Sequence, residues 1–224
     1  MAALTLDALL RALKKRAPDP VYFLYGDEDV LKQEAVQALI AAALEPGARD
    51  FNLDSRFGGD LDVASFHALV NTLPLLADRR VVLVRAIEQV GKRKSKLRDA
   101  MLEYITNPNP STVLVLVTSA GEEPDAELAR GGTAVEIGPL APERVPRWIA
   151  HYAQRLKLEI APDAVEHLLE ATGTDLGTLS RELDKLAALS ADAGTAVTAE
   201  HVAALVGVRR GETVVDLVAA ALER

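Results

Sequence analysis

The chain has 224 residues, of which 49% are hydrophobic and 26% charged, so it is long enough for a sizeable core and for two domains. It contains no cysteine, and its four histidines lack the spacing of metal ligands, which excludes disulfides and thiolate metal sites and leaves no metal or cofactor to expect. A formal net charge of −8 argues against broad affinity for nucleic acid, because non-specific binding depends on neutralising phosphates.

The N-terminal segment predicts an amphipathic helix that begins near Thr5, with an apolar face made of Leu6, Leu9, Leu10 and Leu13. The segment lacks the basic region followed by an apolar region that marks a secretory signal. No later stretch of the sequence is long and apolar enough to cross a membrane as a helix. We therefore expect a cytoplasmic protein with no membrane partner.

A strand, a glycine turn and a helix are predicted in succession across residues 21–43. Residues 21–25 form a nearly continuous apolar run, which is typical of a strand buried on both faces of a parallel sheet. Gly26 ends the strand, and apolar residues then recur at helical spacing. The acids at 27–29 supply N-cap chemistry and negative charge at the positive end of the helix dipole. This succession is the frame of a phosphate loop.

The chemistry of a phosphate loop is missing from that frame. When Gly26 is taken as the first glycine of G-x-x-x-x-G-K-[ST], Lys32 takes the lysine position. Leu31 then replaces the second glycine, and Gln33 replaces the Ser or Thr that would hold magnesium. The acids at 27–29 would also repel a triphosphate. We interpret the segment as a degenerate phosphate loop that binds no nucleotide, and an ordinary strand–helix unit is the alternative. The degenerate loop comprises Gly26, Asp27, Glu28, Asp29, Lys32 and Gln33.

Four further strands are predicted in the first 139 residues, and helices separate them. The strands are expected at 51–57, 80–85, 112–118 and 134–137, and the helices at 62–72, 97–105 and 125–129. Strands that alternate with helices predict an α/β domain with a parallel sheet of five strands, flanked by helices. The strand at 80–85 ends in Arg85 and Ala86, where a working phosphate-loop ATPase would carry acids for magnesium.

A basic run precedes the helix at 97–105. It contains Lys92, Arg93, Lys94, Lys96 and Arg98. Such a run is usually a solvated face, and the functional alternative is contact with DNA phosphates through Lys92, Arg93, Lys94 and Lys96.

The period of the sequence changes after Pro139 and stays helical. Four short helices are expected across 140–208, where they form a small bundle. The third of them runs from about Asp175 to Leu189 with its leucines facing inward. A last apolar stretch at 214–222 begins a further helix. We expect residues 209–224 to be the start of another helical domain, most of which this chain lacks.

Four segments carry a resemblance to a known family. They are VYFLYGDEDVLKQEAVQAL, NTLPLLADRRVVLVR, GTDLGTLSRELDKLA and ETVVDLVAAAL. Together, and in this order, they closely resemble the delta subunit of the bacterial DNA polymerase III clamp loader. The resemblance implies an AAA+-like domain with a degenerate phosphate loop, a helical lid domain, and the start of a truncated collar domain. It also implies a non-catalytic subunit of the polymerase holoenzyme.

The family resemblance implies partners and a site. The partners are the sliding clamp (the beta subunit), whose ring the subunit opens, and the other clamp-loader subunits through the collar. DNA would be contacted only weakly or within the complex. In the family, the position of Leu73, Pro74, Leu75 and Leu76 carries apolar residues that enter a pocket of the clamp. Ordinary core is the alternative, above all for Leu73, which continues the face of the preceding helix.

Two other functions compete with this reading. One is an ATP-hydrolysing AAA+ protein that uses Lys32 in an atypical loop. The other is a nucleic-acid-binding regulator that works through the basic run. The sequence offers no catalytic dyad or triad, and Leu176 stands where a lid arginine could reach a nucleotide.

Overall fold

The computed structural model describes residues 3–91, 95–190 and 196–206. Lys92, Arg93 and Lys94 of the basic run lie outside the described residues, and so does the stretch at 214–222. The chain divides into two compact units, and the boundary between them falls after Pro139.

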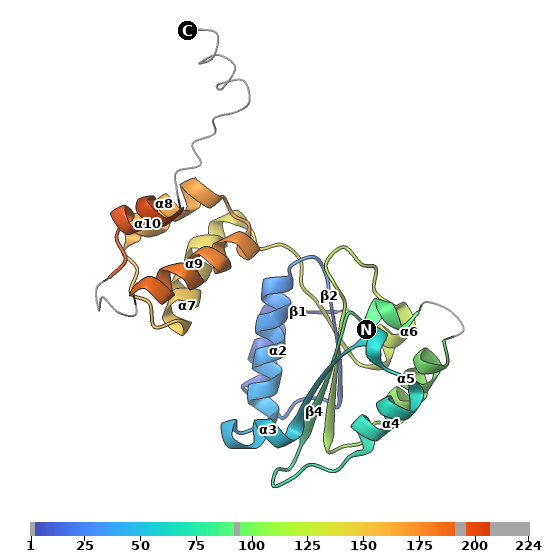
Figure 1. Cartoon of the computed structure of the whole chain (residues 1–224). Coiled ribbons are helices and arrows are strands. Elements are labelled where there is room, and N and C mark those ends of the chain that lie inside the picture. The colour runs from blue at the N-terminus through green and yellow to red at the C-terminus, as the bar shows by residue number, and fades with distance from the viewer. Residues whose placement is uncertain (1–2, 92–94, 191–195, 207–224) are drawn as a thin grey trace. The chain divides into compact units, whose positions relative to one another are not determined.

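A parallel sheet forms the centre of the first unit (Figure 1). Its strands are β1 (Leu4–Thr5), β2 (Val21–Tyr25), β3 (Leu53–Phe57), β4 (Arg80–Arg85), β5 (Thr112–Val117) and β6 (Thr133–Glu136). Among the described residues the sheet has six strands in the order β1-β6-β2-β5-β4-β3, and every neighbouring pair is parallel. The predicted parallel α/β class is confirmed.

The expectation of five strands is wrong, because it did not include β1. This strand has two residues, which is too short for any hydrophobic period to appear in the sequence. It pairs Leu4 with Val135 and Thr5 with Glu136 at the edge of the sheet. Helix α1 (Leu6–Leu13) follows at once, and the Thr5 side chain accepts a hydrogen bond from the Ala8 N–H at 3.3 Å, so the predicted cap is confirmed.

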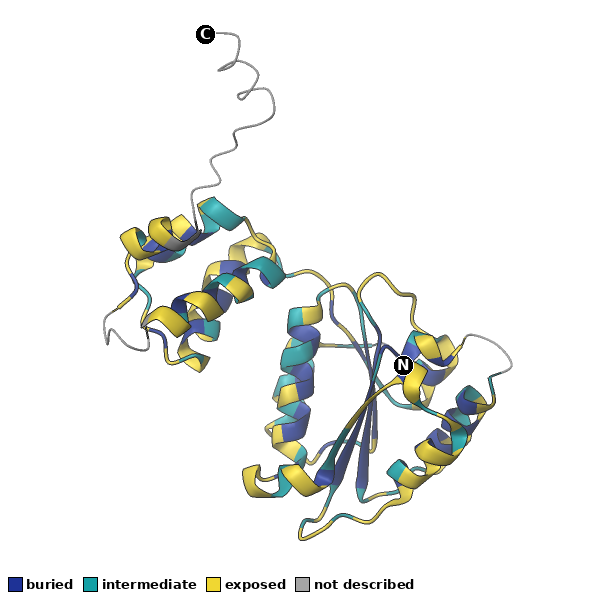
Figure 2. Cartoon of the chain, in the orientation of Figure 1, coloured by how far each residue is buried: buried dark blue, intermediate teal, exposed yellow. Residues whose placement is uncertain are grey.

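Helices cover both faces of the sheet (Figure 1). Helix α2 (Asp29–Ala43), which contacts α1, lies on one face. Helices α4 (Val63–Asn71), α5 (Lys96–Thr106) and α6 (Ala126–Gly131) lie on the other. Each helix turns a buried stripe toward the strands, and the outer face is exposed (Figure 2). This arrangement explains why β2, β4 and β5 read as continuous apolar runs, since their side chains are covered on both sides.

Short helical turns complete the connections of the first unit. They are η1 (Pro46–Ala48), α3 (Arg49–Asn52), η2 (Gly58–Asp60) and η3 (Ile87–Val90). The turn α3 occupies the first two residues of the strand predicted at 51–57, so that strand begins two residues later than its pattern suggested. Helix α4 is capped by Asp62, whose carboxylate accepts the Ser65 N–H at 2.7 Å.

The second unit is a small helical bundle. It contains η4 (Pro142–Arg144), α7 (Val145–Arg155), α8 (Pro162–Thr172), α9 (Leu176–Ser190) and α10 (Ala199–Val206). Trp148, Ile149 and Leu168 are buried in it, together with most of the leucines of α9. Leu189, predicted to face inward, is exposed near the end of α9. Within the described ranges of both units, no helix is long and apolar enough to cross a membrane.

Candidate functional site

The loop between α4 and β4 presents a group of exposed leucines. Leu73 is 75% exposed, Leu75 53% and Leu76 93%, and Pro74 is half-buried between them. Leu75 and Leu76 therefore face solvent, and the alternative that they are ordinary core is wrong. Leu73 is not core either, because α4 ends at Asn71 and the helix face that Leu73 would have continued ends with it. Exposed leucines grouped in one loop are typical of a protein interaction site.

Leu76 holds an unusual backbone conformation. Its φ is 53°, in the left-handed region that residues with a β-carbon rarely adopt. Its nearly complete exposure means that no burial of its own side chain compensates for this conformation. Strained conformations of this kind persist where the surrounding structure fixes them, and they gather at functional sites.

Asn52, at the end of α3, fixes the middle of the loop. Its side chain is fully buried, with 0% exposure. Its amide donates hydrogen bonds to the carbonyl of Leu75 at 2.8 Å and to that of Ala48 at 2.9 Å. Its amide oxygen accepts the Leu75 N–H at 2.7 Å. Both backbone polar groups of Leu75 are therefore paired with one side chain.

Two arginines hold the ends of the loop. The Arg80 guanidinium, almost fully buried at the start of β4, forms an ion pair with Asp54 of β3. It also donates to the carbonyls of Thr72 and Leu73, at 3.3 and 3.5 Å. Arg79 donates to the Pro18 carbonyl at 2.6 Å. The loop is thus anchored on both sides of the exposed leucines.

A hollow of about 460 Å³ lies beside Leu76. The end of α2 lines it with Ala41, Ala42, Ala43 and Leu44, and Ala17 and Pro18 also line it. Leu76, Ala77 and Arg79 form the loop side of this hollow. The leucines therefore stand next to a concave surface with many small apolar side chains.

The Lys32 side chain makes its contacts inside the protein. The Lys32 side chain is 2% exposed, and its ammonium donates to the Thr118 carbonyl, just after β5, at 2.8 Å. It is also 2.7 Å from the carboxylate of Asp29. The positive charge is satisfied by groups of the protein itself, and Lys32 links α2 to the end of β5.

The turn at Gly26 closes against the end of β6. Gly26 has a φ of 115°, and a β-carbon built there would lie 2.2 Å from the carbonyl oxygen of Ile137.

The cap expected from the acids at 27–29 is wrong, because Glu28, the N-cap residue of α2, makes no side-chain cap hydrogen bond. The Asp27 carboxylate instead accepts the Gly121 N–H at 3.1 Å. A contact with a distant loop thus engages Asp27, whereas Asp29 lies in the first turn of α2, where the acidic charge was expected. Gln33, the last position of the loop, is half-buried.

Glu88 is the first acid after β4 and lies close to Lys32. Its carboxylate accepts hydrogen bonds from the hydroxyl of Ser119 at 2.6 Å and from its N–H at 3.2 Å. Burial acts to raise the pKa of Glu88, but the Ser119 hydrogen bonds and the charge of Lys32 outweigh it and leave the pKa below its ordinary value. The acid therefore belongs to a paired internal network.

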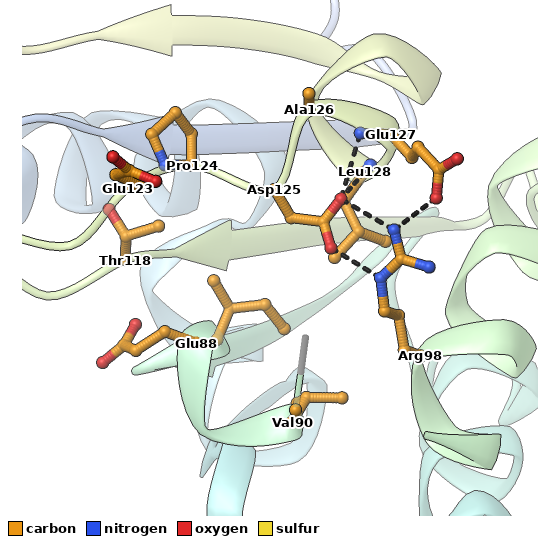
Figure 3. Close-up of a pocket in the computed structure, with 12 residues that line it drawn as sticks. Glu88, Val90, Arg98, Thr118, Glu123, Pro124, Asp125, Ala126, Glu127 and Leu128 are labelled. Atoms are coloured by element: carbon orange, nitrogen blue, oxygen red, sulfur yellow. Dashed lines mark hydrogen bonds and ion pairs between the residues drawn. The ribbon is translucent and has the colours of Figure 1, made fainter. Parts of the chain in front are cut away.

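A cavity of about 350 Å³ opens between η3 and α6 (Figure 3). Arg98, which lines it, donates to Asp125 at 2.6 and 3.0 Å and to Glu127. The hydrogen bonds from Arg98 hold the pKa of Asp125 below its usual range, against the opposing effect of burial. Arg98 is thus paired with acids, so the basic run contributes one cation fewer than its sequence indicates. Lys96, the described member of the proposed DNA contacts, is exposed at the start of α5.

Comparisons with known proteins agree on one family. A family model described as DNA polymerase III, delta subunit, matches residues 22–128, and a second model, described as a middle domain, matches residues 145–204. The DNA polymerase III subunit delta of Bacillus subtilis (strain 168) is 28% identical over 193 residues, which are 81% of this chain and 55% of that protein. This chain is a homologue of the DNA polymerase III delta subunit.

Solved structures place the fold of this delta homologue. The Bacillus subtilis DNA clamp loader delta protein (YqeN) superposes with a TM-score of 0.59 at 25% identity, over 91% of this chain and 62% of that one. The Thermotoga maritima RuvB Holliday junction branch migration motor has a TM-score of 0.56 at 16% identity, over 85% and 62% of the two chains, and shares the fold alone. The delta homologue spans about half the length of the curated relative it matches.

Sequence reasoning found the exposed leucines of the delta homologue but missed the residues that hold them. Asn52 lies in the stretch at 51–57 that the sequence predicts as a strand. Its partner, Leu75, is 23 residues away in sequence. No local pattern links the two positions, although a lone asparagine beside a short helical turn is a signal of backbone capping.

Proposed function

We propose that this delta homologue binds the sliding clamp of DNA polymerase III through Leu73, Pro74, Leu75 and Leu76, and opens the ring during loading onto primed DNA. The observation that carries the proposal is the exposure of three leucines in an anchored loop. Exposed apolar side chains in a fixed conformation are ready to enter a partner's pocket without first being ordered.

The energy available at the loop is sufficient for a hot spot. Two leucine side chains that enter an apolar pocket remove about 200 Å² of surface from water, which corresponds to roughly 5 kcal/mol before association costs. Interaction energy in protein interfaces is concentrated in a few buried anchors of this kind. Leu75 and Leu76 are therefore the anchors of the proposed contact.

We further propose that this chain does not bind or hydrolyse ATP. Lys32 is engaged by Thr118 and Asp29, so reaching a nucleotide would require breaking both contacts. Gln33 also offers no hydroxyl for magnesium. In this proposal the strand–turn–helix frame supports the fold, and the rival ATP-hydrolysing function predicts nucleotide binding that calorimetry with ATP and magnesium would detect.

The proposed organisation follows that of a clamp-loader subunit. Residues 1–139 form the AAA+-like domain, 140–208 the lid, and 209–224 the start of a collar that joins the other loader subunits. DNA contact through Lys92, Arg93, Lys94 and Lys96 belongs to the assembled complex in this proposal, because the net charge of the chain is −8.

The test is binding of the chain to the cognate sliding clamp by surface plasmon resonance. Leu75→Ala combined with Leu76→Ala should weaken binding at least a hundredfold and change the melting temperature by less than about 2 °C, since exposed side chains contribute little to folding. Phe57→Ala is the matched control. Phe57 is also exposed, but it lies at the carboxyl end of β3, paired with Arg85, whereas the leucine loop lies at the amino end of β4. Unchanged clamp affinity in the double variant would show that the loop is not the contact.

A further inference from the structure

We infer that Asn52 is a positioning residue that presents Leu75 and Leu76 to the clamp in one conformation. The inference rests on the proposed function and assigns a role to a residue that does not itself face the partner. It follows from the three hydrogen bonds of a fully buried side chain and from the exposure of the leucines that it holds.

The hydrogen-bond pattern is specific to asparagine. The amide oxygen accepts from the Leu75 N–H while the amide nitrogen donates to the Leu75 carbonyl, so one planar group pairs with both polar atoms of one residue. The second amide hydrogen binds the Ala48 carbonyl, one turn back, and this bond fixes the orientation of the amide. Aspartate has the same shape but would face two carbonyl oxygens with a carboxylate.

The same contact opposes any movement of the loop. If Leu75 left its position, the buried amide of Asn52 would lose two partners in a place that water does not reach, and unpaired buried polar groups are costly. The exposed side chains of Leu75 and Leu76 provide little burial of their own to resist such a movement. Asn52 therefore carries a large share of the conformational preference of the loop.

Leu76 depends on this preference. Its φ of 53° is unfavourable for leucine, so a loop released from Asn52 would relax toward ordinary backbone and turn the Leu76 side chain elsewhere. Arg80 holds Thr72 and Leu73 at one end of the loop, and Arg79 ties the other end to Pro18, so the middle of the loop is left to Asn52.

Loss of positioning reduces affinity in a calculable way. The apparent dissociation constant equals the intrinsic constant divided by the fraction of molecules in the competent conformation. If Asn52→Ala lowers that fraction to about one tenth, clamp affinity falls about tenfold although every contacting side chain is intact. We expect Asn52→Asp to lower affinity at least as much. Aspartate keeps the volume of the side chain but replaces the donating amide nitrogen with a second accepting oxygen.

The experiment measures clamp affinity, melting temperature and hydrogen exchange of the Leu75 amide by NMR in the full chain. Asn52→Ala should weaken binding about tenfold and abolish the protection of the Leu75 amide. Val135→Ala, a truncation in the buried strand β6, is the control for lost stability and should leave affinity unchanged. If Asn52→Ala does not fold, Asn52→Ser provides the second variant. The serine hydroxyl keeps a small polar group at this position but cannot make all three hydrogen bonds of the amide.

A double-mutant cycle with Leu76→Ala separates positioning from general damage. If Asn52 acts by presenting Leu76, Asn52→Ala should cost clearly less affinity when residue 76 is alanine, while the losses in melting temperature add. Equal losses in both backgrounds would overturn the inference, as would wild-type affinity with an unprotected Leu75 amide. If Leu75→Ala with Leu76→Ala binds the clamp normally, the proposed function itself fails, and that result is distinct from the other two.

Discussion

Replacing Lys32 with methionine tests whether this residue supports the fold or serves a nucleotide. Methionine keeps most of the apolar volume of the lysine stem and removes the ammonium that binds Thr118 and Asp29. If Lys32 is a structural link between α2 and β5, the variant should be less stable in the absence of any nucleotide. If Lys32 is a phosphate ligand, the nucleotide-free protein should be indifferent to the change.

The expected loss follows from the contacts. A hydrogen bond from a charged donor to a buried acceptor contributes about 1.5–3 kcal/mol. The ion pair adds only a few tenths of a kcal/mol, because Asp29 is exposed to solvent. Removing the need to bury an ammonium offsets part of the loss, which leaves about 1–2 kcal/mol. For a chain of this size that lowers the melting temperature by roughly 2–8 °C.

The assay is thermal unfolding followed by circular dichroism, with and without ATP and magnesium. We expect the Lys32→Met variant to melt earlier under both conditions and the wild type to show no shift with nucleotide. Lys185→Met is the matched control. Lys185 is exposed on α9, where it pairs with Glu182, so its replacement should leave the melting temperature unchanged. An unchanged melting temperature in Lys32→Met, together with loss of an ATP-dependent shift present in the wild type, would refute the structural role.

Two further predictions concern the backbone at Leu76 and the bond between Arg98 and Asp125. Leu76→Val should melt several degrees below Leu76→Asn although the position is exposed, because a β-branched residue fits a φ of 53° poorly and asparagine tolerates it; equal melting temperatures would contradict the strained backbone. Arg98→Met should lower the melting temperature at pH 7. Arg98 lowers the pKa of Asp125, so the bond between them stabilises the fold while the carboxylate is ionised, and this stabilisation is lost as the carboxylate is protonated. The difference in melting temperature between wild type and Arg98→Met should therefore shrink below about pH 4. A constant difference from pH 7 to pH 3 would be inconsistent with the Arg98–Asp125 bond.

Local patterns in the sequence were enough to place most of the elements. Strands β2 and β4 occupy the predicted residues, because a run of apolar side chains covered on both faces leaves an unmistakable signal. The cap at Asp62 follows from the chemistry of one residue and its neighbour three positions on. The exposed leucines were found through the resemblance of their segment to a family, and no period in the sequence distinguishes them from core.

The tertiary structure alone decided which groups meet across the fold. The link from Lys32 to Thr118 joins residues 86 apart in sequence, and that from Asn52 to Leu75 joins residues 23 apart. Strand β1 exists because β6 offers it an edge, and Asp27 accepts the N–H of the distant Gly121 while the N-cap residue of α2, Glu28, makes no side-chain cap hydrogen bond. Short elements and buried polar pairs carry little periodic signal. Their energy comes from partners that folding brings together, so the amino-acid sequence by itself left them undetermined.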